Sequence, residues 1–271
     1  MSESPETPPA VMIFAGLDPT GGAGLQADIE TITSMGCYSL PLVTALTVQN
    51  TEKVLRFEAM DPLLLVEQAR AVLEDIPVAA FKIGMLGSAQ MAEAIHSILM
   101  DYPEPVVVID PVLAGGGGGS LTDEETIDAM VELLLPETTV ITPNSVEARI
   151  LAPEADSLDA CAQEILDYGC EYVLITGTHE ATPQVANILY SERRKLETFY
   201  WERLPESYHG SGCTLSAGIA ALLAHGLEPF TAIHEAQEYT WQALQNGFRP
   251  GLGQFVPNRF YWTRDDEDAD R

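Results

Sequence analysis

The sequence predicts an α/β fold with a mainly parallel sheet and helices on both of its faces. Short apolar runs alternate along the chain with segments of helical periodicity, a pattern typical of such folds. The chain has 271 residues, of which 46% are hydrophobic, so it can bury a large core and is not disordered. No repeat or linker interrupts the pattern. We therefore expect one domain over residues 1–271, with loose ends at 1–8 and 265–271.

Strands are predicted from apolar runs bounded by turn residues. The run 106–109 contains only β-branched residues, as expected for a strand covered on both faces. The last two predicted strands are close enough in sequence to form a hairpin. The predicted ranges are 9–17, 39–48, 79–86, 106–109, 138–141, 173–175, 186–190 and 196–201.

Helices are predicted between these strands from apolar spacing and capping residues. The first carries Leu25, Ile29, Ile32 and Met35 and stops at Gly36. The later helices begin at recognisable caps or small residues: Asp61 before Pro62 for a helix to about Ile76, Ser88 for a helix carrying Met91, Ile95 and Ile98, a capping box at Thr122 and Glu125 for a helix to about Leu135, and the closing helices 212–225 and 231–246.

The charge of the chain limits its partners. It has 41 Asp and Glu residues against 13 Lys and Arg, a net charge of −28, which argues against nucleic acid and anionic membranes. A soluble cytosolic protein and an adaptation to high salt both fit this surplus. The N-terminus lacks the features of a signal peptide, and no apolar run reaches the ~20 residues of a membrane span. No two of the cysteines form a C-x-x-C pair, so we expect a cytoplasmic protein with free thiols.

Four segments that follow predicted strands carry residue types suited to chemistry, because ligands of such sheets bind beyond the carboxyl ends of the strands. The first is 15–24, whose glycines allow close backbone approach; a tight turn into a helix is the alternative. It is neither a Walker A loop nor a full G-x-G-x-x-G pattern, which argues against a dinucleotide oxidoreductase. Asp18 and Asp28 flank this turn, and Asp28 could instead be a capping residue.

The second and third segments offer oxygen ligands. Asp110 stands at the end of a buried strand, where it can hold a cation or a water. The glycines 115–119 suggest a mobile loop that closes on a ligand, or a plain flexible loop. Asn144 and Glu147 lie three residues apart on one face at a strand-to-helix junction and suit Mg²⁺. The alternative is an N-cap asparagine with an exposed first-turn glutamate.

The fourth segment is 208–217, in which small residues open a helix whose free N–H groups form an anion site. A helix start also lowers the pKa of a cysteine, so we expect Cys213 to act as a thiolate or a base. A small buried cysteine is the alternative. We expect His209 to be structural or exposed, and a Cys213–His209 nucleophile pair is a further alternative.

Together these segments resemble the hydroxymethylpyrimidine/phosphomethylpyrimidine kinases of thiamine biosynthesis, which belong to the ribokinase-like superfamily. The run Gly16-Leu-Asp-Pro-Thr-Gly-Gly-Ala-Gly-Leu-Gln-Ala-Asp28 is similar to the family's G-x-D-P-S-G-G-A-G-x-Q-A-D, and His209-Gly-Ser-Gly-Cys-Thr-Leu-Ser216 is similar to its H-G-T-G-C-T-L-S. The resemblance covers about 11–260 and implies a ribokinase-like three-layer sandwich. Further motifs follow in the family's order at 43–51, 82–87, 110–112 and 142–144 with Glu147.

The resemblance implies two successive ATP-dependent phosphorylations. The first is at the hydroxymethyl group of 4-amino-5-hydroxymethyl-2-methylpyrimidine, and the second is at the phosphate just made. On the substrate side, the resemblance places Asp28 and Gln49 at the aminopyrimidine edge, Met85 against the ring, and Gly16 and Asp18 beside them. A carboxylate and an amide can match the donors and acceptors of such an edge.

The same resemblance assigns the transfer step to the start of the last-but-one helix. The amides of Gly210, Ser211 and Gly212 would form an anion hole, and Cys213 would be the base or activator of the acceptor hydroxyl. The resemblance also implies a homodimer, and Mg²⁺ held by Asp110, Asn144 and Glu147.

Two departures from the family pattern remove lysines from the phosphate site. Thr176-Gly-Thr-His179 stands where many members have Lys-Gly-Gly-His, and the polyglycine run stands where many have Ala-Lys-Ser-Gly. We expect Thr176, Thr178 and Asn144 to bind the nucleotide, with Lys82 and Mg²⁺ supplying positive charge. Two other functions stay open: a pyridoxal kinase, and a non-catalytic regulator that binds a pyrimidine or a nucleotide.

Overall fold

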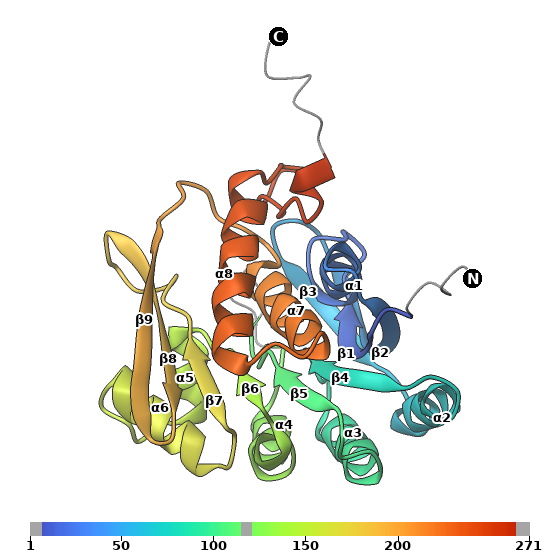
Figure 1. Cartoon of the computed structure of the whole chain (residues 1–271). Coiled ribbons are helices and arrows are strands. Elements are labelled where there is room, and N and C mark those ends of the chain that lie inside the picture. The colour runs from blue at the N-terminus through green and yellow to red at the C-terminus, as the bar shows by residue number, and fades with distance from the viewer. Residues whose placement is uncertain (1–6, 115–120, 264–271) are drawn as a thin grey trace, which may run out of the picture.

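A single nine-stranded sheet organises the computed structural model of the chain, which describes residues 7–114 and 121–263 (Figure 1). The strand order is β3-β2-β1-β4-β5-β6-β7-β8-β9. The strands from β2 to β7 in this order are parallel, whereas β3 pairs antiparallel with β2, and β8 pairs antiparallel with β7 and β9. The strands are β1 Ala10–Leu17, β2 Tyr38–Gln49, β3 Val54–Ala59, β4 Val78–Ile83, β5 Val106–Ile109, β6 Val140–Ile141, β7 Tyr172–Ile175, β8 Gln184–Ser191 and β9 Arg194–Glu202.

Helices cover both faces of this sheet and make the protein a three-layer sandwich. The alternation along β1 shows why: Val11 and Ile13 face a core shared with α1, α7 and α8, whereas Met12 and Phe14 face a core shared with the other helices. In Figure 1, α7 and α8 lie in front of the sheet. The helices are α1 Gly24–Ser34, α2 Pro62–Leu73, α3 Ala89–Asp101, α4 Glu124–Ala129, α5 Ser145–Leu151, α6 Leu158–Asp167, α7 Ser211–Ala224 and α8 Pro229–Gln245.

The predicted fold class is confirmed, and each predicted strand coincides with an observed one, although several ends shift. Sequence reasoning missed β3 and α6. β3 is an edge strand whose residues are half-buried or exposed, so it has no continuous apolar run. α6 was missed although its sequence carried the signal: Ser157 caps it, and its buried residues Cys161, Ala162, Ile165 and Leu166 recur at helical spacing.

The predicted helix from Thr122 to Leu135 is the largest correction. Asp123, not Thr122, caps it, because its carboxylate accepts hydrogen bonds from the N–H and hydroxyl of Thr126 at 2.9 and 2.6 Å. The α-helix ends at Ala129 and continues as a π-helical turn and a short 3-10 helix. The predicted loop 115–119 and most of the predicted loose ends lie outside the described residues. No helix within the described ranges is long and apolar enough to cross a membrane.

The parallel strands place their carboxyl ends along one edge of the sheet. Direct backbone hydrogen bonds tie these ends together: the N–H of Gly84 donates to Phe14 at 2.8 Å, and that of Asp110 donates to Ile83 at 2.8 Å. The predicted chemical segments therefore leave the sheet at neighbouring positions, as the rule for such folds requires.

Candidate active site

The first loop, residues 18–24 after β1, is built around Asp18. Its Oδ1 accepts from the N–H of Thr20 at 2.8 Å, and its Oδ2 accepts from the N–H of Ala23 at 2.9 Å and lies 2.8 Å from His209 Nε2. Burial by itself would raise the pKa of Asp18, but hydrogen bonds from His209 and Thr20 bring it down to about 2. The Asp18 carboxylate therefore organises the loop, and its contact with a substrate stays a prediction.

The start of α7 is in backbone contact with the first loop. Gly210 has a φ of 84°, and a Cβ there would lie 2.0 Å from the carbonyl oxygen of Gly22. Only glycine fits such a position. The N–H groups of the first helical turn have no partner inside the helix, which makes residues 210–213 a natural anion site.

Asp28 and Lys82 form a fully buried ion pair behind this contact. Lys82 Nζ donates to Asp28 Oδ2 at 2.8 Å, and both side chains are 0% exposed. Burial raises the pKa of Asp28 to about 6, although Lys82 lowers it. Burial alone would lower the pKa of Lys82, but Asp28, Cys213 and Asp110 together raise it above its usual range. This corrects the expectation that Lys82 supplies free positive charge to phosphates, because buried carboxylates already use that charge.

Cys213 lies between Asp110 and the first loop. It is hydrogen-bonded to the Asp110 carboxylate and to the backbone N–H of Gly24. Burial, and then the charge of Asp110, raise the pKa of Cys213 to about 12, although Lys82 opposes them. This pKa argues against the predicted thiolate near neutral pH, because burial and Asp110 outweigh the helix start. No hydrogen bond between Cys213 and His209 is found in the described parts of the chain; His209 Nε2 lies 2.8 Å from Asp18 Oδ2 instead.

Asn144 and Glu147 form a capping box at the start of α5. Asn144 Oδ1 accepts from the N–H groups of Val146 and Glu147, both at 2.9 Å, and Glu147 Oε2 accepts from the N–H of Asn144 at 2.9 Å. The amide oxygen of Asn144 thus caps the helix, and a metal role for Asn144 stays a prediction. Glu147 is buried rather than exposed, which separates it from the simple capping alternative.

Asp110 and Glu147 remain as a carboxylate pair that suits a divalent cation. Burial, and next the charge of Asp110, raise the pKa of Glu147 to about 8; burial also raises the pKa of Asp110. Two buried carboxylates that repel each other would gain from a cation, and Mg²⁺ needs only one or two of them. Among the residues that the structure describes, no group of three or more His, Cys, Asp or Glu side chains could hold a metal ion.

Met85 and Gly16 lie against each other at the ends of β4 and β1. A Cβ on Gly16 would be 3.0 Å from the Met85 sulfur. Met85 is buried with Ala45 and Leu121 in a small apolar cluster. Gln49 ends β2 and is half-buried, and no hydrogen bond found in the described parts of the chain joins it to Asp28.

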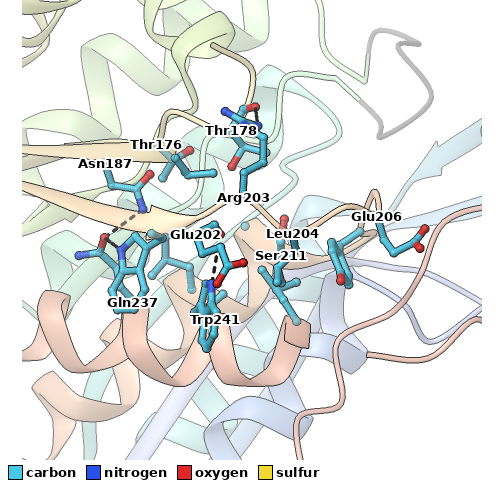
Figure 2. Close-up of a pocket in the computed structure, with 17 residues that line it drawn as sticks. Thr176, Thr178, Asn187, Glu202, Arg203, Leu204, Glu206, Ser211, Gln237 and Trp241 are labelled. Carbon is cyan, nitrogen blue, oxygen red and sulfur yellow. Dashed lines mark hydrogen bonds between the residues drawn. The ribbon is translucent and has the colours of Figure 1, made fainter. Parts of the chain in front are cut away.

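A cavity of about 150 Å³ opens on the other side of the α7 start (Figure 2). Its lining brings together four residues that the sequence placed near phosphate: Thr176, Thr178, Ser211 and Gly212. Asn144 and Lys82 are not part of this lining. The described lining contains no lysine, and its charged residues are Glu202, Arg203 and Glu206.

The far wall of the cavity is an amide and indole network that the sequence did not reveal. Gln237 Oε1 accepts from Asn187 Nδ2 at 2.9 Å and from Trp201 Nε1 at 3.1 Å. The rings of Trp201 and Trp241 stack with centroids 6.4 Å apart. Asn187 Oδ1 accepts from the N–H of Gly177, which locks the loop after β7 to this wall at 3.0 Å.

Arg203 is the cation of this cavity. Figure 2 shows it beside Thr178, and its guanidinium donates to the carbonyl oxygens of Thr178, Glu180 and Thr182 at 2.8, 2.9 and 3.0 Å. Arg203 therefore fixes the 178–182 loop that forms the rim of the cavity.

The family model for phosphomethylpyrimidine kinase matches residues 18–258, nearly the whole chain. The chain belongs to the phosphomethylpyrimidine kinase family. A hydroxymethylpyrimidine/phosphomethylpyrimidine kinase from Synechococcus elongatus is 36% identical over 258 residues, which are 93% of this chain and 98% of that relative. The family expected from the motifs is thus confirmed.

Solved structures of this fold family match the chain over most of its length. A phosphomethylpyrimidine kinase from Clostridium difficile 630 superposes with a TM-score of 0.75 at 32% identity, covering 88% of this chain and 100% of that one. An ADP complex of pyridoxal kinase from Bacillus subtilis superposes with a TM-score of 0.86 at 29% identity, covering 96% and 100%. The ribokinase-like architecture fits both.

Two arginines of this family member were missed by sequence reasoning. Arg203 and Arg259 lie outside every motif, and nothing in their immediate sequence marks them. The one available signal was the small number of basic residues. Because the chain has only 13 Lys and Arg residues, each one near a predicted strand end was a candidate site residue.

Proposed function

We propose that this chain is an ATP-dependent kinase of thiamine biosynthesis that phosphorylates 4-amino-5-hydroxymethyl-2-methylpyrimidine and then its monophosphate. Membership of the phosphomethylpyrimidine kinase family supports the reaction. The start of α7 is the observation that carries the assignment to this site. Gly212 lines the cavity on one side, whereas Gly210 and Cys213 contact the first loop on the other. A phosphoryl group between the two sides would meet the free N–H groups of this turn.

The cavity would hold the nucleotide. The ADP complex of the Bacillus subtilis pyridoxal kinase supports nucleotide binding by this fold. The hydroxyl groups of Thr176, Thr178 and Ser211 can donate to phosphate oxygens, and the amide and indole wall suits a flat base. Neutral donors thus take the place of the two missing lysines.

The acceptor would bind between Met85 and the first loop. Met85 offers an apolar face to a ring, and the missing side chain of Gly16 lets the Met85 side chain pack close to the end of β1. Asp28 Oδ1 is buried and has no hydrogen-bond partner among the described residues. That atom can accept from an amino or hydroxyl group of the substrate, while Lys82 holds Oδ2 in place. The contact of Gln49 with the pyrimidine stays a prediction.

Asp110 and Glu147 would hold Mg²⁺, because each is a buried carboxylate with a raised pKa. Bound there, the ion would neutralise charge on the nucleotide phosphates.

Cys213 would position the acceptor hydroxyl as a protonated thiol. Its raised pKa makes it a poor base near neutral pH. Phosphoryl transfer needs little proton abstraction, because positioning and electrostatics dominate it.

A pyridoxal kinase is the second candidate. The pyridoxal kinase from Bacillus subtilis superposes with a higher TM-score, 0.86, than the Clostridium difficile phosphomethylpyrimidine kinase at 0.75. The acceptor side has one ring-packing residue and one free carboxylate oxygen, a combination that both ring systems can use. A homodimer stays a prediction.

Product analysis by mass spectrometry tests the proposal. The protein, ATP and Mg²⁺ are incubated with one acceptor at a time: the hydroxymethylpyrimidine, its monophosphate or pyridoxal. Each incubation is run at low and at high KCl, and a chelator is added in the control. We expect pyrimidine mono- and diphosphate, lost on chelation. Pyridoxal phosphate alone would establish the second candidate. Nucleotide binding without any product would leave only the binding regulator.

A further inference from the structure

Arg259 is a fully buried arginine near the C-terminus, 1% exposed, that lies in none of the motifs. Its guanidinium makes three directed contacts. Nη2 donates to the carbonyl oxygen of Gly22 at 2.6 Å, Nε to the hydroxyl of Thr214 at 3.0 Å, and Nη1 to Glu30 Oε2 at 3.0 Å. Each acceptor belongs to a different element: the first loop, α7 and α1. One planar group thus joins three parts of the chain.

The contacts converge on the junction between the two sides of the site. The hydroxyl of Thr214 links Arg259 to the first turn of α7, because it also donates to the carbonyl oxygen of Gly210 at 2.8 Å. A Cβ on Gly210 would lie 2.9 Å from Arg259 Nη2 and 2.0 Å from the oxygen of Gly22. Arg259 therefore packs directly behind the turn where the first loop touches the start of α7.

Arg259 is itself held firmly from behind. Its carbonyl oxygen accepts from the hydroxyl of Tyr239 at 2.6 Å and from that of Ser34 at 2.8 Å. Its backbone is therefore tied to α8 and α1, so the guanidinium projects from a fixed base. Its charge also reaches the acceptor side, because it lowers the pKa of the Asp28 carboxyl against the larger effect of burial.

A stability role alone explains this arrangement poorly. Burying an arginine costs desolvation energy, and Glu30, its ion-pair partner, is still 30% exposed at the side chain. Apolar residues of similar volume would fill the same space without that cost. The planar guanidinium instead sets the relative position of two elements, because it binds a carbonyl of the first loop and a hydroxyl of α7 at the same time.

We propose that Arg259 is a positioning residue for phosphoryl transfer, holding the first loop in register with the first turn of α7. The inference rests on the proposed kinase function. Without the guanidinium fork, the anion site and the acceptor site would keep their residues, but the two sites would lose their alignment with each other. Misplacement of reacting groups by about 1 Å can cost about 100-fold in rate.

Steady-state kinetics of Arg259→Met and Arg259→Lys test this role. We expect kcat with the hydroxymethylpyrimidine to fall about 100-fold in Arg259→Met, and to fall less in Arg259→Lys, which keeps the charge but not the fork. The Kd for AMP-PCP should stay near that of the wild type, because Arg259 does not line the nucleotide cavity. Arg249→Met is the matched control: among the described residues, this arginine of the same C-terminal segment bonds only the Leu252 and Gly253 carbonyls, so its loss should leave kcat unchanged.

Hydrogen exchange separates a failure of this inference from a failure of the kinase proposal. In both Arg259 variants, amides of 18–24 and 210–214 should exchange faster than in the wild type, whether or not the wild type phosphorylates a pyrimidine. If the Met variant fails to fold, Thr214→Val removes one acceptor of the fork and should lower kcat in the same direction. A wild-type kcat in the folded Arg259→Lys and Thr214→Val proteins, or unchanged exchange, would overturn the inference.

Discussion

The two proposed sides of the site are built from different kinds of chemical group. The acceptor side contains the buried ion pair of Asp28 with Lys82, and the buried Asp18 carboxylate hydrogen-bonded to His209. The nucleotide side relies on hydroxyl groups, amides and indoles, and its one cation, Arg203, is already bonded to carbonyl oxygens. In a chain of net charge −28, positive charge is scarce, and the cations near the site bind oxygen atoms of the protein and hold its loops and side chains in place. Substitutions on the acceptor side should therefore affect stability and kcat, whereas those on the nucleotide side should affect KM.

Lys82→Met should have the largest effect, because it leaves the Asp28 carboxylate buried without its partner. Removing one member of a buried pair costs about 3–5 kcal/mol of unfolding free energy. We expect the urea midpoint to fall accordingly, and the double variant Lys82→Met, Asp28→Asn to recover much of the loss without recovering activity. Lys195→Met, at an exposed position, is the control. Equal midpoints for Lys82→Met and the control would remove the distinction between the two sides.

Gly210→Ala tests the junction where the sides meet. Gly210 and Gly226 have nearly the same left-handed φ, 84° and 83°, but a Cβ meets Gly22 only at Gly210 and nothing within 4 Å at Gly226. Both alanine variants should lose about 1–2 kcal/mol from the backbone conformation. Only Gly210→Ala should also lose about 100-fold in kcat. Similar kcat values in the two variants would show that the close contact is not needed for the reaction.

Arg203→Gln tests the nucleotide side. It removes the charged donors that fix the rim loop, and hydrogen bonds that involve a charged group are worth about 1.5–3 kcal/mol net. We expect the KM for ATP to rise about tenfold, with kcat at saturating ATP close to the wild type. Arg194→Gln, on the exposed β8–β9 hairpin, is the control. A fall in kcat with unchanged KM would contradict the expectation that substitutions on the nucleotide side affect KM.

Acid unfolding should show the smallest effect. The pKa of Asp18 is lowered from 3.8 to about 2 in the folded protein, so its charged form favours folding. That contribution is complete above the unfolded value and is lost as the pH falls from about 4 to 2. Asp18→Asn should therefore be less stable than the wild type at pH 6 but decline less steeply over this window. Urea midpoints at a series of pH values measure this, and parallel curves would contradict it.

The sequence predicted the layers of the fold because strand and helix periods are local properties. The run 106–109 and the Ser88 cap are examples that the structure confirms. It missed β3, whose edge position removes the apolar run. Local patterns also indicated the residue types at the site, since glycines and strand ends mark it, and Thr176, Thr178, Ser211 and Gly212 do line one cavity.

The sequence could not predict which distant residues the polar side chains of the site would pair with. Asp18 and Lys82 have the chemistry of ligand-binding residues, but tertiary contacts pair them with His209 and Asp28. Asn144 differs, because its cap at the start of α5 is a local contact that the sequence already offered as an alternative. The pKa of Cys213 follows the same rule. The helix start predicts a lowered value, whereas burial and Asp110, which arrive from elsewhere in the chain, raise it.

A crystal structure of the protein with AMP-PCP and the hydroxymethylpyrimidine would test the central claim most directly. We expect the nucleotide in the cavity of Thr176 and Trp241, its terminal phosphate on the N–H groups of 210–213, and the acceptor hydroxymethyl group beside Cys213 with the ring on Met85. A nucleotide bound elsewhere, or an acceptor that does not reach the first turn of α7, would contradict the account.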